Sequence, residues 1–261
     1  MTADHPIRVV LFCNRHLEPA ARRFLVRLAE HPEIELVGAF AQGGEASKRE
    51  RFREVLRRRG VLGLPVFALG LLRSALQRML RSAQTRDWER RAAPLVARIE
   101  VVPDLHAPAM LQRISALQPD LGLIYGAPIL KPSLFEIPRL GTLGIHHGRL
   151  PAYRGRKTTF WQVFNGEREI GVTIQQVDAG ADTGRVVLMD GIPAGRKPFR
   201  RIVRETQALG VDLYIDAILQ IRRGLARPWT PPGRRGRHYR DPTLWQILQL
   251  PFRRLFRRQR R

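Results

Sequence analysis

Short apolar runs alternate with segments of helical periodicity along most of the chain, and this alternation limits the possible folds more than any other feature. An apolar run over residues 7–12 precedes a stretch with apolar residues at helical spacing, residues 18–30, and a second apolar run over residues 34–40. Such a strand–helix–strand order favours a parallel sheet covered by helices. We therefore expect an α/β fold.

The same rhythm returns near residue 99 and continues to residue 223. The pattern predicts further strands at residues 99–102, 121–125, 143–146, 170–177 and 186–190, and helices at residues 107–117, from 159, and over 198–223. No GxGxxG pattern follows the first strand and no Walker A pattern occurs. The sequence therefore gives no motif for a dinucleotide or P-loop site.

The composition indicates a reducing compartment. The single cysteine, Cys13, excludes an intramolecular disulfide. The chain opens directly into a strand without a signal-peptide pattern, and no apolar run approaches the ~20 residues of a membrane span. We therefore expect a cytoplasmic protein.

The formal net charge of +23 comes almost wholly from arginine. A strongly positive field favours acidic ligands such as nucleotides, phosphosugars, RNA or anionic lipid. The charge alone does not choose among these partners.

Two segments depart from the α/β rhythm. Residues 45–98 are basic with an apolar centre at residues 61–72, which predicts a helical insertion in a main domain of residues 1–225. This insertion either packs against the domain or offers a basic, apolar surface to a membrane or a partner. Residues 226–261 form a basic C-terminal extension, either a solvated end or an amphipathic anchor for RNA or an anionic membrane.

Chemically useful residues follow three of the predicted strands. Residues 125–130 follow one strand, His146 ends another, and Asp178 and Asp182 lie in the turn after a third. In an open parallel sheet the active cleft lies beyond the carboxyl ends of the strands. An imidazole and a carboxylate from neighbouring strand ends can form a base and the group that orients it. The sequence therefore indicates a catalytic site at this edge.

Several of these segments together resemble the folate-dependent formyltransferases, a family that includes the methionyl-tRNA, glycinamide ribonucleotide and amino-sugar formyltransferases. The resemblance is strong from about residue 119 to residue 190, plausible over residues 7–41 and absent from the insertion. The matching segments are residues 125–130, 137–141, 145–146, the Leu-Pro-Ala-Tyr-Arg-Gly loop at 150–155, 165–167, Gly-Val-Thr-Ile at 171–174 and Asp-Thr-Gly at 182–184.

The resemblance implies a Rossmann-like, mostly parallel sheet and the use of 10-formyltetrahydrofolate as formyl donor, with no metal. His146 matches the catalytic histidine of the family and Asp182 its catalytic aspartate. The resemblance also assigns residues to binding of the pterin and to the acceptor loop. The pterin-binding residues are Tyr125, Gly126, Ala127, Pro128, Ile129, Leu130, Gly180 and Ala181, and the loop residues are Tyr153, Arg154 and Gly155.

One position departs from the family pattern. The family has an asparagine two residues before the histidine, where this chain has Gly144. Removing one hydrogen-bond donor to a developing oxyanion costs about 10²–10³ in rate, so reduced or lost activity is expected unless another group substitutes. His147 and Asn14 are the candidate substitute donors, and the sequence does not choose between them.

The sequence thus predicts an N-formyltransferase that acts on an amine. An amino-sugar nucleotide or another small anionic amine is favoured over Met-tRNA, because the residues after about 225 are too few for the β-barrel domain of the tRNA enzymes. Hydrolysis of the formyl-folate, with water as acceptor, is a close variant. The alternative is a catalytically impaired relative that binds RNA or an anionic membrane, as a peripheral protein, through its basic insertion and tail.

Overall fold

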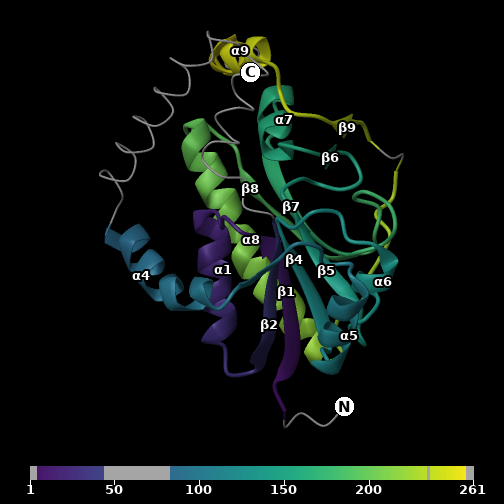
Figure 1. Cartoon of the computed structure of the whole chain (residues 1–261). Helices are drawn as coiled ribbons and strands as arrows, with labels where there is room; N and C mark the ends of the chain where they lie inside the picture. Colours follow the sequence, from purple (N-terminus) through teal and green to yellow (C-terminus); the bar gives the residue numbers. More distant parts are fainter. Residues whose placement is uncertain (1–4, 44–82, 234–235, 257–261) are drawn as a thin grey trace, which may run out of the picture.

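The computed structural model describes residues 5–43, 83–233 and 236–256, which form an α/β fold around one mixed sheet (Figure 1). Its strands are β1 (Ile7–Asn14), β2 (Ile34–Gln42), β3 (Glu100–Val102), β4 (Leu121–Tyr125), β5 (Thr142–His146), β7 (Glu169–Gln176) and β8 (Val186–Pro193). They lie in the order β3-β2-β1-β4-β5-β7-β8. The first five are parallel, and β7 and β8 are antiparallel to their neighbours. The predicted mostly parallel α/β sheet is confirmed.

Helices cover both faces of the sheet. Helices α1 (Pro19–Ala29) and α8 (Phe199–Arg222) pack on one face, and α5 (Pro108–Ala116) and α6 (Pro132–Phe135) pack on the other. On the first face, Phe24 and Tyr214 stack with ring centroids 4.6 Å apart. The buried hydroxyl of Tyr214 donates to the carbonyl of Leu143 at 2.7 Å, so that α8 fixes the position of β5.

The predicted insertion is described only in its last part. Helix α4 (Ala83–Ala97) lies beside α1, where Arg91 forms an ion pair with Glu30 and Arg23 of α1 lies over the ring of Trp88 at 5.5 Å from the centroid. These contacts attach α4 to the domain. Residues 45–82 of the predicted insertion lie outside the described residues.

The C-terminal segment crosses back over the domain. Strand β9 (His238–Tyr239) pairs in parallel with β6 (Arg154–Gly155), and Tyr239 stacks on Tyr153 with ring centroids 5.3 Å apart. Trp161, in α7 (Thr158–Asn165), donates its indole N–H to the carbonyl of Arg240 at 2.8 Å. We call residues 236–241 the strap, because they hold the loop that contains β6.

Helix α9 (Leu244–Phe256) follows the strap and lies next to α7 at the top of Figure 1. Its Leu250 is buried among aromatic residues of α7, and Arg253 lies over the ring of Phe164 at 4.2 Å from the centroid. No helix in the described ranges combines the length and apolarity required to cross a membrane.

Candidate active site

Strands β5 and β7 bring three positions together on one face of the sheet. In their antiparallel register, His146 lies opposite Thr173 and Gly144 lies opposite Gln175. Because side chains alternate along a strand and paired residues share a face, Gly144, His146 and Gln175 all belong to the same side. Asp182, from the turn after β7, covers this group of residues.

His146 and Asp182 form an ion pair. The distance between His146 Nδ1 and Asp182 Oδ1 is 3.2 Å. Two further donors hold the carboxylate: the backbone N–H of Gly155 to Oδ2 at 2.7 Å, and the side-chain amide of Gln175 to Oδ1 at 3.2 Å. Asp182 itself has a positive φ of 54°, a conformation that Asp tolerates better than most residues. The turn is therefore shaped to present this carboxylate.

These contacts decide the charge of Asp182. Burial by itself would raise the pKa of the carboxyl, but the hydrogen bond and charge of His146 and the donors Gly155 and Gln175 outweigh it. The pKa of Asp182 consequently lies below its ordinary value, so that this side chain is a carboxylate at neutral pH.

The outer nitrogen of His146 meets the backbone. His146 Nε2 lies 2.7 Å from the carbonyl oxygen of Tyr153. Both ring nitrogens thus face oxygen atoms of the protein, and the tautomer decides which nitrogen donates. Asp182 is the more accessible member of the pair, with 20% of its side chain exposed against 7% for His146.

The loop at residues 148–155 is tied to the same group. Arg154 donates to the carbonyl of Ala181 at 2.6 Å, next to Asp182. The Tyr153 hydroxyl donates to Glu167 at 2.6 Å and accepts from Asn165 at 3.1 Å. The predicted loop residues Tyr153, Arg154 and Gly155 therefore all lie beside the His146–Asp182 pair or its support.

The two candidate substitute donors, His147 and Asn14, differ in their placement. His147 packs toward α8, where its ring would lie 3.1 Å from a Cβ added to Gly210. Burial, followed by the charge of His146, lowers the pKa of His147 to about 4. Asn14 is exposed at the end of β1, with its amide nitrogen 3.1 Å from a Cβ added to Gly126. The ring of His147 is therefore directed away from the face that carries Gly144. Asn14 alternates with Phe12, whose partner Ile124 pairs with Gly144, so Asn14 lies on the same face as Gly144, two strands away.

The predicted pterin-binding residues form two sets. Residues 126–130 follow β4 with Gly126 at a φ of 74°, Leu130 buried and Ile129 exposed. Tyr125 points to the opposite face, where its ring lies 5.2 Å from that of Phe24. The second set is directly beside the pair: Gly180 donates its N–H to Asp178 at 3.0 Å, and Ala181 precedes Asp182.

Gln175 is a site residue that the sequence did not single out. It is 8% exposed, its amide nitrogen is bound to Asp182, and its Oε1 is buried without a hydrogen-bond partner among the described residues. Opposite it, a Cβ added to Gly144 would meet only Val177, at 3.5 Å. A buried, unpaired oxygen next to open space fits a reactant that carries an N–H group.

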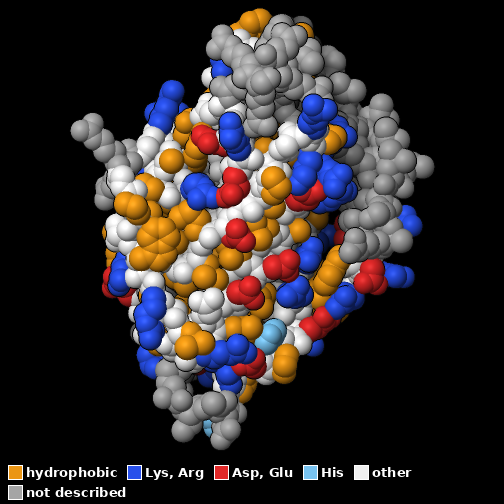
Figure 2. All heavy atoms as spheres, turned by 180° about the vertical axis from the view of Figure 1, so that it is seen from behind, with side chains coloured by type: hydrophobic (Ala, Val, Ile, Leu, Met, Phe, Trp, Pro, Cys, Tyr) orange, Lys and Arg blue, Asp and Glu red, His pale blue; other side chains and the backbone are white. Residues whose placement is uncertain are grey.

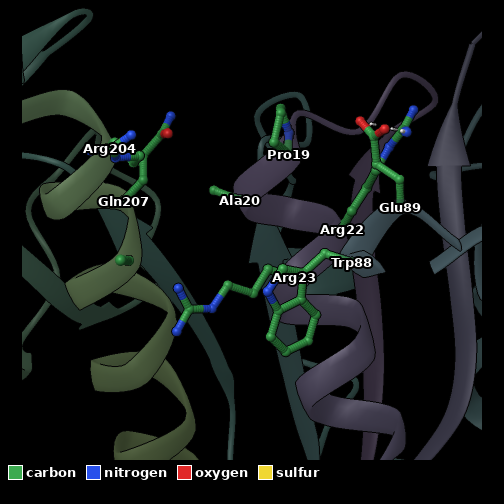
Figure 3. A pocket seen from close by; sticks show the side chains of 9 residues that line it. Pro19, Ala20, Arg22, Arg23, Trp88, Glu89, Arg204 and Gln207 are labelled. Atoms are coloured by element: carbon green, nitrogen blue, oxygen red, sulfur yellow. Dashed lines mark ion pairs between the residues drawn. The ribbon is translucent and has the colours of Figure 1, made fainter. Parts of the chain in front are cut away.

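A separate pocket of about 140 Å³ lies on the other face of the sheet, between α1, α4 and α8. Figure 3 shows Arg23 reaching across the space between α1 and α8, beside the indole of Trp88, with Arg204 and Gln207 on α8. The opposite face carries His146, so this pocket is distinct from the candidate active site. Over the described ranges, no three His, Cys, Asp or Glu side chains gather as a metal site.

The sheet order, the strand-end histidine and the turn-borne aspartate together define an α/β protein of the formyltransferase type. A family model described as "Formyl transferase" matches residues 83–218, slightly more than half of the chain. The chain belongs to this formyltransferase family.

Individual relatives are similar over part of their length. A methionyl-tRNA formyltransferase of Synechococcus sp. (strain JA-2-3B'a(2-13)) is 33% identical over 131 residues, which are 49% of this chain and 40% of that protein. The chain therefore spans less than half of this curated relative.

Solved structures agree on the fold. Glycinamide ribonucleotide transformylase 1 from Symbiobacterium toebii matches with a TM-score of 0.56 and 18% identity, over 85% of this chain and 90% of that one. HypX from Aquifex aeolicus in complex with tetrahydrofolic acid matches with a TM-score of 0.53 and 18% identity, over 92% of this chain and 30% of that one.

Proposed function

We propose that the protein is an N-formyltransferase that moves a formyl group from 10-formyltetrahydrofolate to an amine. The observation that carries the proposal is the His146–Asp182 ion pair, held by Gly155 and Gln175 at the end of β5 in a chain of the formyltransferase family. Such a pair supplies the proton transfer and the positive charge that acyl transfer to an amine requires.

In the proposed reaction, the amine nitrogen forms a bond to the formyl carbon, and the C=O electron pair moves onto the formyl oxygen. The attacking nitrogen releases a proton to the Asp182–His146 pair, with Asp182 as the accessible member. The electron pair on the formyl oxygen then re-forms the C=O bond while the bond between the formyl carbon and N10 breaks, and N10 leaves with the electron pair of that bond and receives a proton. The products are a formamide and tetrahydrofolate, so atoms and charge balance.

The proposed acceptor is a small anionic amine, such as an amino-sugar nucleotide. The surplus of basic residues, 46 Lys and Arg against 23 Asp and Glu, favours an acidic acceptor. On the face in Figure 2, however, basic and acidic side chains are interspersed among the described residues, unlike a continuous basic surface for RNA. Met-tRNA, the acceptor in the name of a relative, remains the competing acceptor in the test.

The test mixes purified protein with 10-formyltetrahydrofolate and follows release of tetrahydrofolate, with amino-sugar nucleotides, other small anionic amines, Met-tRNA and no acceptor as parallel arms. We expect release that depends on one of the small anionic amines. Release without any amine would identify a hydrolase, and release only with Met-tRNA would overturn the acceptor. No turnover in any arm, together with no folate binding by calorimetry, would overturn the proposed activity.

A specific observation favours a second role, attachment to an anionic membrane through α9. The exposed large apolar residues of the described chain concentrate on this helix, with Trp245 67% exposed. Leu244, Leu248 and Phe252 recur every four residues and thus share one side, which Trp245 and Ile247 flank. Monomeric proteins rarely leave such an apolar face uncovered.

The arginines that follow the apolar face favour an anionic membrane as the partner of α9. Six arginines fall within residues 253–261, adjacent in sequence to the apolar face. Apolar and aromatic residues on one side of a helix with arginines close by are typical of helices that lie in the interface of an anionic bilayer. Single-stranded RNA would instead be expected to stack on aromatic residues along a basic groove.

The test of this role is flotation of the protein with vesicles of phosphatidylcholine alone and of phosphatidylcholine with phosphatidylserine. We expect binding to the anionic vesicles that decreases at high salt and is lost when residues 244–261 are deleted. Unchanged binding after the deletion, or binding to RNA but not to vesicles, would overturn the membrane role.

A further inference from the structure

At position 144, no side chain is present to donate a hydrogen bond to the formyl oxygen. Formyl transfer places negative charge on the formyl oxygen, and a hydrogen-bond donor fixed at that point stabilises the transition state. Gly144 has no side chain to donate. The space next to it is open, because an added Cβ would meet only Val177 at an ordinary contact distance of 3.5 Å.

An amide is nevertheless present on the same face, on the neighbouring strand. Gln175 lies directly opposite Gly144 in the β5–β7 register. Directly opposite residues of an antiparallel pair have Cβ atoms only about 4.5–5.5 Å apart. The Gln175 side chain therefore reaches the region that a side chain at position 144 would fill, and it is more than nine-tenths buried there.

The orientation of this amide is fixed by Asp182. A carboxylate can only accept hydrogen bonds, so the nitrogen of the Gln175 amide faces Asp182, at 3.2 Å, and the oxygen points away from it. One hydrogen on Nε2 is used by Asp182, which leaves the second hydrogen free to donate. Oε1 is buried and has no partner in the part of the chain that the structure describes.

We propose that Gln175 is a catalytic residue whose amide supplies the hydrogen bonds at the reacting carbon that Gly144 does not. The free N–H of Nε2 donates to the formyl oxygen as it gains charge, and Oε1 accepts an N–H of the attacking amine. Formyl oxygen and amine nitrogen are attached to the same carbon in the transition state, just as Oε1 and Nε2 share one carbon in Gln175, so the two groups match in spacing. This inference rests on the proposed formyl transfer.

The same geometry explains why the amide is held by Asp182. The bond to the carboxylate fixes the side chain of Gln175, so that no reorganisation of the donor is needed during the reaction. It also couples donor and proton acceptor, because one carboxylate contacts both His146 and Gln175.

The first test replaces the amide by a side chain of similar length, Gln175→Met, and measures kcat and KM with 10-formyltetrahydrofolate and the active amine. Loss of a donor that acts in the transition state should lower kcat by about 100-fold or more, with the KM for the folate changed less than about threefold. Turnover within about threefold of the wild type would overturn the inference.

The second test leaves Gln175 in place and adds the side chain that the family carries, Gly144→Asn. Because Gln175 already supplies the donor, the kcat of this variant should stay within about threefold of the wild-type value. In the Gln175→Met background, the same change should raise kcat at least about tenfold above that of Gln175→Met alone. An increase of roughly 100-fold from Gly144→Asn alone would show that the wild type lacks a donor, and would overturn the inference even if Gln175→Met does not fold.

The outcomes separate the two proposals. Wild-type turnover with an active Gln175→Met variant overturns the role of Gln175 and leaves the proposed function intact. An inactive wild type that Gly144→Asn activates also overturns the role of Gln175, while it supports the site. An inactive wild type that Gly144→Asn leaves inactive overturns the proposed function and the inference with it.

Discussion

The site around His146 and the helix α9 break the usual distribution of side chains in opposite ways. Around His146, polar and charged groups are buried: the imidazole, the amide of Gln175 and most of Asp182. On α9, five large apolar side chains are exposed. Buried polar groups and exposed apolar patches are the two informative departures from a hydrophobic interior and a polar surface. We propose a partner for each: reactants for the first region, and a lipid surface for the second.

The two regions differ in how firmly contacts within the chain hold their side chains. Asp182 accepts from three donors within the chain, and its pKa is lowered by them. Within the described part of the chain, no comparable contacts are found on the outer side of α9, although Leu250 and Arg253 fix its inner side. The polar groups of the first region are therefore held in place by the chain itself, whereas the apolar side chains of the second region are left open to a partner.

The largest effect should come from breaking the ion pair. His146→Ala and Asp182→Asn should each lower kcat/KM by about 10²-fold or more, because proton transfer by a positioned side chain contributes about 10²–10⁴. The double variant should lose little beyond either single one, since the residues act as a unit. His31→Gln, at the turn between α1 and β2, is the matched control. Wild-type rates of tetrahydrofolate release in either single variant would show that the site lies elsewhere.

A smaller loss is expected from breaking the strap. A Cβ in Gly155→Ala would lie 2.3 Å from the carbonyl oxygen of Tyr239, and the displaced backbone would weaken the bond from Gly155 to Asp182. Turnover should fall by roughly tenfold or more. Gly141→Ala, also at a positive φ but with nothing within 4 Å, controls for backbone strain alone. Equal turnover and melting temperature in the two variants would show that the strap does not support the site.

The exposed face of α9 should respond to polar substitution without loss of folding. Trp245→Ser combined with Leu248→Ser should weaken binding to anionic vesicles by about tenfold or more, since burial of each large apolar side chain is worth roughly 1.5–3 kcal/mol. The free energy of unfolding should change by less than about 0.5 kcal/mol per residue. Leu250→Ala, on the buried side of the same helix, should instead lower stability by about 2 kcal/mol or more. Undiminished vesicle binding by the double variant would contradict the membrane role.

The smallest effect concerns the buried imidazole of His147. Its pKa in the folded chain is about 4, below the ordinary value of about 6.5 that it regains on unfolding. Between these values the unfolded chain binds a proton that the folded chain does not, so the free energy of unfolding falls as the pH falls from about 6.5 to about 4. The slope contributed by this one group is at most about 1.4 kcal/mol per pH unit.

Denaturant titrations at pH 7, 6 and 5 measure this slope. His147→Gln removes the titrating group and should flatten the dependence relative to the wild type. Asp182 does not interfere in this range, because its lowered pKa places its own titration at lower pH. An identical pH dependence for the wild type and His147→Gln would contradict the predicted burial.

The sequence predicted the sheet well because each of its buried strands is a recognisable apolar run. Apolar runs at residues 7–12 and 121–125 correspond to the buried strands β1 and β4, and the periodicity of residues 198–223 corresponds to α8. These features depend on local patterning, which a single sequence contains.

The sequence predicted the proximity of His146 and Asp182 from strand ends that meet at one edge, and this reason was wrong. Strand β7 runs antiparallel to β5, so its end at Gln176 lies beside Leu143, and the turn that follows returns Asp182 to His146.

Other parts required the three-dimensional register. Gln175 lies in a strand and looks like any polar residue there, and only its pairing with Gly144 shows that the two share a face. The pairing of β6 with β9 joins two residues to two others more than 80 positions away. Strands of two residues are too short to show an apolar alternation in the sequence. His147 was open as a donor until its packing against Gly210 showed which way its ring points.

The strap also has a consequence for when the site can exist. It pairs with Arg154 and Gly155, and Gly155 donates to Asp182, so one of the three contacts of Asp182 lies next to residues synthesised long after it. During translation, His146 and Asp182 leave the ribosome while His238 and Tyr239 are still to be added. The nascent chain therefore carries both members of the ion pair before β9 can pair with β6, and the contacts of the strap form only once residue 239 has emerged.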